Sequence, residues 1–169
     1  METNVKLYSL GLTQTRTYLL ALVFVAGNVV LPQLCHLIPQ GGLILLPIYF
    51  FTLVGAYKYG LRLGLLTAVL SPVVNHLLFG MPAASVLPIL LVKSTLLAVA
   101  AAWVARRYNQ VSIPLLLLVV LSYQLMGGLV EWAVTGSLAA ALQDFRLGLP
   151  GLAVQVLGGY VVLRWLMKK

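Results

Sequence analysis

Residues 39–88 read PQGGLILLPIYFFTLVGAYKYGLRLGLLTAVLSPVVNHLLFGMPAASVLP, and they contain two apolar runs of membrane-spanning length. A short basic turn at residues 57–62 joins the two runs, and a stretch rich in proline and glycine bounds the segment at each end. About 20 apolar residues span the hydrocarbon core of a bilayer. The segment therefore predicts a helical hairpin in a membrane, and the position of its turn fixes the side on which every other loop lies.

The composition of the whole chain indicates the same environment. Of the 169 residues, 62% are hydrophobic and 8% are charged, and the mean hydropathy is +1.03. A soluble domain of this size needs a more charged surface, so we expect one integral membrane domain over residues 1–169, with the lipid bilayer around it. The net charge is +8, but the basic residues lie between apolar runs, so we expect no nucleic-acid partner.

Six apolar runs predict an all-α bundle of six transmembrane helices. The runs cover residues 17–34, 42–57, 61–79, 84–105, 113–134 and 150–167. The polar N-terminal segment that precedes them is expected to be a cytoplasmic tail and not a signal peptide. The lone cysteine, Cys35, cannot form an intramolecular disulfide.

The distribution of basic residues predicts the orientation of the bundle. If the N-terminus is inside, nine of the eleven Lys and Arg residues fall in inner segments, and Arg146 alone falls in an outer loop. Because basic residues favour cytoplasmic loops, we expect both termini in the cytoplasm. The nine inner residues are Lys6, Arg16, Lys58, Arg62, Arg106, Arg107, Arg164, Lys168 and Lys169.

Polar side chains inside the expected helices concentrate in the outer half of the bundle. Lys93 and Glu131 carry charges, and burying a charge in a bilayer costs at least about 2.5 kcal/mol, so both must face protein, water or each other. The inner halves of the helices are mostly Leu, Val and Ala. This asymmetry favours a shallow cavity that receives a solute from outside, without a polar path that would conduct it through the membrane.

Each polar feature also has a purely structural interpretation. Lys93 and Glu131 could form only an ion pair between helices, and Asn75 could form a hydrogen bond between helices. His36, beside Cys35, could form a metal site with His76, or both histidines could be interfacial hydrogen-bonding groups. The motifs GxxxxGK[ST], HExxH and GxSxG do not occur, so we expect neither catalysis nor a cofactor.

The proline and glycine pattern of residues 39–88 resembles that of the S component, the substrate-binding membrane subunit of energy-coupling factor (ECF) transporters. The matching positions are Pro39, Gly41, Gly42, Pro47, Gly55, Gly60, Gly64, Ser71, Asn75, Gly80, Met81 and Pro82. The resemblance implies a six-helix bundle in a bacterial cytoplasmic membrane. It also implies capture of a vitamin or vitamin precursor in an outward pocket, and delivery to a T component with two cytoplasmic ATPases.

Carried onto this chain, the resemblance implies a pocket among helices four to six and the outer loops. Its residues would be Lys93, Gln124, Gly128, Glu131 and Gln155, with His36, Gln40, Asn75 and His76 from the loops and outer ends. Small residues of the first helix, here Thr17 and Ala21, would dock on the T component. Lys93 fits an acidic vitamin, Glu131 with Trp132 fits a cationic one, and Cys35 with the two histidines fits cobalamin.

Two other interpretations remain open from the sequence. The chain also resembles MreD, a cell-shape scaffold of similar size and helix count, if every polar residue is structural. A small membrane enzyme or a metal or cobalamin-related binder would instead use Cys35, His36 and His76.

Overall fold

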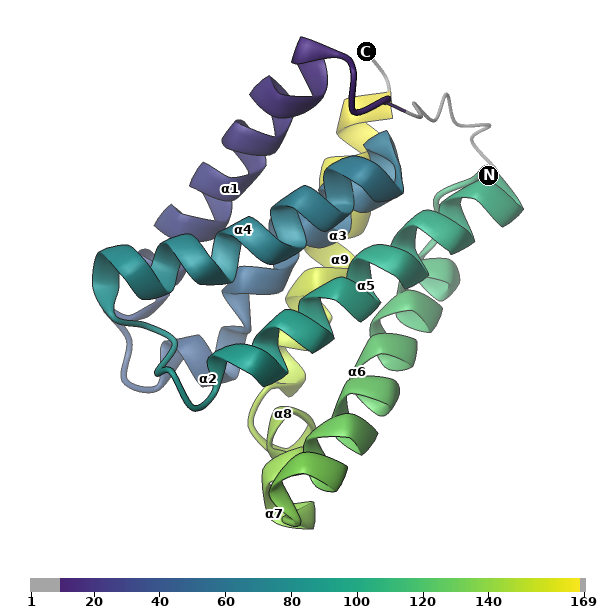
Figure 1. The fold of residues 1–169 in the computed structure, drawn as a ribbon. Helices are drawn as coiled ribbons and strands as arrows, with labels where there is room; N and C mark the ends of the chain where they lie inside the picture. The colour runs from purple at the N-terminus through teal and green to yellow at the C-terminus, as the bar shows by residue number, and fades with distance from the viewer. Residues whose placement is uncertain (1–9, 168–169) are drawn as a thin grey trace.

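The computed structural model describes residues 10–167, and every element in that range is helical. Lys6, Lys168 and Lys169 of the charge count, and the two ends of the predicted domain, lie outside the described residues. The elements are α1 (Thr15–Cys35), α2 (Gly41–Leu45), η1 (Pro47–Tyr49), α3 (Phe50–Tyr59), α4 (Leu61–Phe79), α5 (Leu87–Tyr108), α6 (Ile113–Thr135), α7 (Leu138–Ala141), α8 (Gln143–Arg146) and α9 (Leu149–Met167) (Figure 1). The all-α class expected from the sequence is confirmed for this part of the chain.

Five of these helices, α1, α4, α5, α6 and α9, are long and apolar enough to cross a membrane. They coincide with five of the six predicted runs. Large apolar side chains cover their outer surfaces, as Leu22 on α1 and Leu77 on α4 illustrate with exposed fractions of 67% and 75%. Such surfaces fit a multi-pass membrane protein, because lipid can cover them at no hydrophobic cost.

The predicted helix at residues 42–57 is not continuous, and this corrects the sequence interpretation. Leu46 has φ 45° and ψ 48°, which ends α2 and separates it from η1 and α3. Proline lacks an N–H donor and disfavours the helical conformation in the residue before it, so Pro47 explains the break at Leu46. The helix that resumes, α3, has 10 residues and is about 15 Å long, half the thickness of a bilayer core.

The short helix α3 lies inside the bundle. Residues 52–58 are all buried, and α3 packs against α1, α4, α5 and α9. Glycines allow this close packing: a Cβ at Gly64 of α4 would lie 2.5 Å from the Cβ of Ala56. The turn of the hairpin therefore lies where it was expected, with Gly60 at φ 91° between α3 and α4, but only the second arm, α4, is long enough to span a membrane.

Asn28 of α1 holds the pieces of this hairpin together. Its Nδ2 donates to Thr52 Oγ1 at 3.0 Å and to Ser71 Oγ at 3.1 Å, and its Oδ1 accepts from the backbone N–H of Phe51. The first N–H groups of a helix lack partners within that helix, so Asn28 supplies one to α3. The side chain is fully buried and serves the fold.

Different elements begin and end at the two ends of the bundle. The α3–α4 turn, the start of α1 and the end of α9 share one end (Figure 1), where the Leu10 N–H donates to the Tyr59 carbonyl. At the other end, α1, α4 and α6 end and α5 begins. We call this second end the pocket end, because the cavity described below lies there.

Candidate functional site

A cavity of about 780 Å³ occupies the pocket end. Its wall comes from the last turns of α1, from α2 and η1, from the α4–α5 connection, from the first turns of α5, and from the end of α6 with α7 and α8. Most of the wall is apolar, and Leu46, Ile89 and Leu90 are examples. The break at Leu46 therefore has a structural consequence, since it places that side chain and η1 in the cavity wall.

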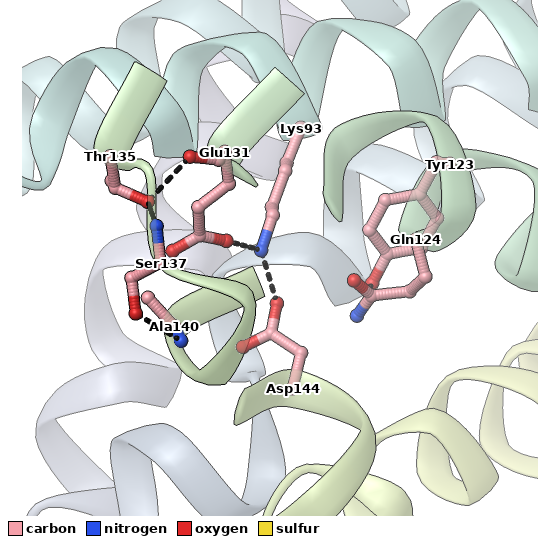
Figure 2. A network of polar contacts seen from close by, with 8 residues as sticks. All are labelled: Lys93, Tyr123, Gln124, Glu131, Thr135, Ser137, Ala140 and Asp144. Carbon is pink, nitrogen blue, oxygen red and sulfur yellow. Dashed lines mark hydrogen bonds and ion pairs between the residues drawn. The ribbon is translucent and has the colours of Figure 1, made fainter. Parts of the chain in front are cut away.

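Three charged side chains form an ion cluster in this wall, which we define as Lys93, Glu131 and Asp144. The Nζ of Lys93 lies 2.6 Å from Oε2 of Glu131 and 2.8 Å from Oδ2 of Asp144. Figure 2 shows the ammonium group between the two carboxylates, with Glu131 reaching it from α6 and Asp144 from α8. The Lys93 side chain is 4% exposed, and each carboxylate side chain is 15% exposed.

Asp144 is a functional candidate that the sequence interpretation missed, as is Gln33, which is described below. Asp144 lies in the α6–α9 connection, which the sequence pattern marks only as an outer loop. The signal that could have found it is the acidic count: the chain has three acidic residues, and a buried lysine recruits carboxylates. Two of the three do converge on Lys93.

A glycine on α6 makes room for the lysine. A Cβ at Gly127 would lie 2.5 Å from Cγ of Lys93, closer than real Cβ contacts. The aliphatic stem of Lys93 therefore crosses α6 at Gly127 on its way to the carboxylates. We assign this glycine to positioning of the ion cluster.

The turn after α6 positions Asp144. Thr135 Oγ1 donates to the Glu131 carbonyl at 2.7 Å and accepts from the Ser137 N–H at 3.2 Å. Ser137 Oγ then accepts from the Ala140 N–H and caps the short helix α7. These bonds, drawn in Figure 2, direct the chain back over the pocket end, so that α8 presents Asp144 to Lys93.

Two amide side chains contribute buried polar atoms on the α1 and α4 sides of the cavity. Asn75 is 2% exposed, and its Nδ2 donates to the carbonyls of Asn28 and Ser71 at 2.9 and 3.0 Å. Its Oδ1 has no hydrogen-bond partner among the described residues. The same holds for Nε2 of Gln33, one helical turn before His36. We call Gln33 and Asn75 the amide pair.

The cavity wall includes five of the nine predicted pocket residues: His36, Gln40, Asn75, Lys93 and Glu131. The resemblance placed the pocket among helices four to six and the outer loops, but the sixth predicted helix, α9, contributes no residue to the cavity wall. The cavity lies toward α1, the α2–η1 segment and the α4–α5 connection, because the broken hairpin leaves space there.

The other four predicted residues have separate neighbours. Gln124 Nε2 donates to the Tyr123 hydroxyl, which donates to Gln155 Oε1, so these two glutamines join α6 to α9. Gln124 precedes Glu131 by seven residues, about two helical turns, and neither Gln124 nor Gln155 is in the cavity wall. Gly128 packs against α7, where a Cβ would lie 3.3 Å from the Ala141 carbonyl oxygen.

His76 and the proposed metal ligands do not converge. His76 Nδ1 lies 2.7 Å from the carbonyl oxygen of Pro82, in the α4–α5 connection. Cys35 is buried, and no three His, Cys, Asp or Glu residues between positions 10 and 167 are grouped so that they could hold a metal ion. The structure therefore does not assemble Cys35, His36 and His76 into one site.

Thr17 and Ala21, the expected docking residues, point into the bundle. Both are buried, and Thr17 Oγ1 donates to the Gly11 carbonyl at 2.6 Å. The exposed face of α1 instead carries large apolar side chains such as Leu19 and Leu22. The small residues pack within the chain, so a partner on α1 would meet the large ones.

No family model, curated protein or solved structure matches this chain. The structure itself defines an all-helical bundle with five helices long and apolar enough to cross a membrane, and a cavity with an ion cluster at one end.

Proposed function

We propose that this chain is the substrate-binding subunit of an ECF-type importer in a bacterial cytoplasmic membrane. It captures a small micronutrient at the pocket end and delivers it to a T component coupled to two ATPases. The observation that carries the proposal is the cavity of about 780 Å³. Sites for small ligands have volumes of about 300–1,000 Å³, with mostly apolar walls and a few polar groups.

The rest of the interior supports capture without autonomous passage. Beyond the cavity, toward the α3–α4 turn, the bundle is filled by a tightly packed apolar core. Its central members are fully buried, including Leu97, Ala101, Leu116, Val119 and Leu163. A solute bound at the pocket end can cross this core only if the helices rearrange. The sequence contains no motif for ATP hydrolysis that could drive such a rearrangement. A separate energised partner supplies that step in the proposed function.

The orientation in this proposal follows the charge count. With both termini in the cytoplasm, the pocket end faces outward, because the start of α1 and the end of α9 lie at the opposite end (Figure 1). The solute then enters from outside the cell.

The test is purification in mild detergent from the native host, with mass spectrometry of bound small molecules and of co-isolated proteins. We expect a bound micronutrient, and a T component with ATPases among the proteins. A vitamin panel should raise the melting temperature of the purified chain, because a ligand of the folded state stabilises it by mass action.

A cavity-filling variant sharpens this test. Ile89→Trp places a large ring in the cavity wall, and Val99→Trp places the same ring on the exposed surface of the same helix, α5. We expect Ile89→Trp to abolish the ligand-induced shift and Val99→Trp to keep it. A shift that survives Ile89→Trp contradicts binding in this cavity.

A further inference from the structure

Negatively charged side chains outnumber positively charged ones in the cavity wall. Lys93 is the one lysine or arginine in the wall among residues 10–167, and it faces both Glu131 and Asp144. The ion cluster therefore has one positive and two negative formal charges. An uncompensated charge in a medium of low dielectric constant is costly, and a cationic ligand removes that cost. An anionic ligand would add to it.

The hydrogen bonds of the cluster favour the same sign of ligand. A lysine ammonium has three donors, and Lys93 uses two of them on the carboxylates. Its side chain is almost fully buried, whereas Glu131 and Asp144 are partly exposed. Each carboxylate uses one oxygen on Lys93, and no described residue donates to the other oxygen. The free hydrogen-bonding capacity of the cluster consists of acceptors, which suit an N–H donor with a positive charge.

The amide pair gives an independent indication of what the cavity binds. The orientation of the Asn75 amide is fixed, because its Nδ2 donates to two carbonyls and a flipped amide would place its oxygen against both. Its buried Oδ1 is therefore an acceptor without a partner, and the buried Nε2 of Gln33 is a donor without one. Buried polar groups are normally paired, so a ligand that supplies both partners is favoured.

We propose that the cavity binds a small organic cation that also carries a neutral edge with a donor and an acceptor, such as an amide or an aminopyrimidine. This inference rests on the proposed function and specifies its substrate class. The cationic group lies against Glu131 and Asp144, and the neutral edge pairs with Gln33 and Asn75. Carboxylic acids are rejected, because Lys93 is already bound to two carboxylates.

The experiment measures binding of five probes to the detergent-purified chain by calorimetry and by melting temperature. Thiamine and 1-methylnicotinamide are cations with such an edge, choline is a cation without one, and biotin and pantothenate are acids. We expect the first two to bind, choline to bind at least about tenfold more weakly, and the acids to give no shift.

Single variants test each set of residues. Asp144→Asn removes one carboxylate but leaves the pair of Lys93 and Glu131, and Arg146→Gln changes one charge on α8 outside the cavity wall. Gln33→Leu removes the unpaired donor, and Gln14→Leu is the matched change on an exposed residue beside the start of α1. We expect Asp144→Asn to weaken cation binding roughly tenfold to hundredfold. Gln33→Leu should weaken thiamine binding but not choline binding. The controls Arg146→Gln and Gln14→Leu should change the affinity for neither probe.

The outcomes separate this inference from the proposed function. Binding of biotin or pantothenate, or equal cation affinity in wild type and Asp144→Asn, overturns the substrate class and leaves capture of a solute intact. Equal affinity for choline and thiamine overturns the role of the amide pair. If no probe binds and no small molecule is found in the protein from the native host, the proposed function itself is overturned.

Discussion

Lys93 Nζ and Asp144 Oδ2 lie 2.8 Å apart although the two residues are 51 positions apart in the sequence, so one largely buried ion pair ties α5 to α8 at the pocket end. Glu131 shares the same ammonium group from α6. The three side chains thereby fix the α6–α9 connection over the cavity. Because one cation serves two anions, substitutions within the cluster should have unequal effects.

Replacing the cation should destabilise the protein most. Lys93→Met leaves two carboxylates facing each other without a counter-ion, and removing one partner of a buried ion pair costs about 3–5 kcal/mol. We expect a large fall in the free energy of unfolding, measured by denaturant titration in detergent. The triple variant Lys93→Met, Glu131→Gln, Asp144→Asn should recover most of it, and a triple variant as unstable as Lys93→Met contradicts this assignment.

Replacing one anion should have little effect on the empty protein. In Asp144→Asn the cluster becomes neutral and Lys93 keeps Glu131, so we expect the free energy of unfolding to change by no more than about 1 kcal/mol. Thermal denaturation of the ligand-free protein measures this. A loss as large as that of Lys93→Met would mean that Asp144 holds the fold together and leaves no surplus acceptor for a ligand.

Adding a methyl group at Gly127 should disturb the lysine. Gly127→Ala sets a Cβ against Cγ of Lys93, and overpacking of this kind costs about 1–3 kcal/mol. Gly128→Ala is the neighbouring control, since its Cβ meets only the Ala141 carbonyl oxygen at 3.3 Å. We expect a lower melting temperature for Gly127→Ala than for Gly128→Ala. Equal melting temperatures would show that Gly127 does not position the ion cluster.

Removing Asn28 should loosen the hairpin from α1. Asn28→Ala loses three side-chain hydrogen bonds, and such bonds in membrane proteins contribute about 0.6 kcal/mol each, so we expect a loss of about 2 kcal/mol. Ser122→Ala is the control, because its exposed hydroxyl bonds only the Leu118 carbonyl of its own helix. Hydrogen exchange should rise at the start of α3 in Asn28→Ala and not in the control.

Local sequence patterns predicted the five long helices and several residues of the cavity, but not the elements that form its wall. The five long helices follow from the length of their apolar runs, and the turn at Gly60 follows from its glycine and neighbouring charges. The break at Leu46 was missed because the apolar run continues through it, although Pro47 is the physical cause. The family resemblance placed Gln124 and Gln155 in the pocket, whereas both bind Tyr123 and neither is in the cavity wall.

Asp144 illustrates a second limit of prediction from local sequence. Its role depends on how α7 and α8 return over the pocket end, and that path is set by contacts distant in sequence. The pairing of Lys93 with Glu131, in contrast, was among the sequence interpretations, because two charges within adjacent apolar helices have few other partners. That interpretation is confirmed by the 2.6 Å contact, although the role of the pair in ligand binding stays a prediction.

The enclosed position of α3 has a consequence for how the chain tolerates sequence change. Lipid-facing positions such as Leu22 accept many apolar residues, since the fluid chains around them adapt to any shape. Positions 52–58 touch only protein on every side, so almost any exchange there meets a rigid neighbour. In a saturation library, this ten-residue helix should therefore accept fewer replacements per position than the four long helices that pack against it.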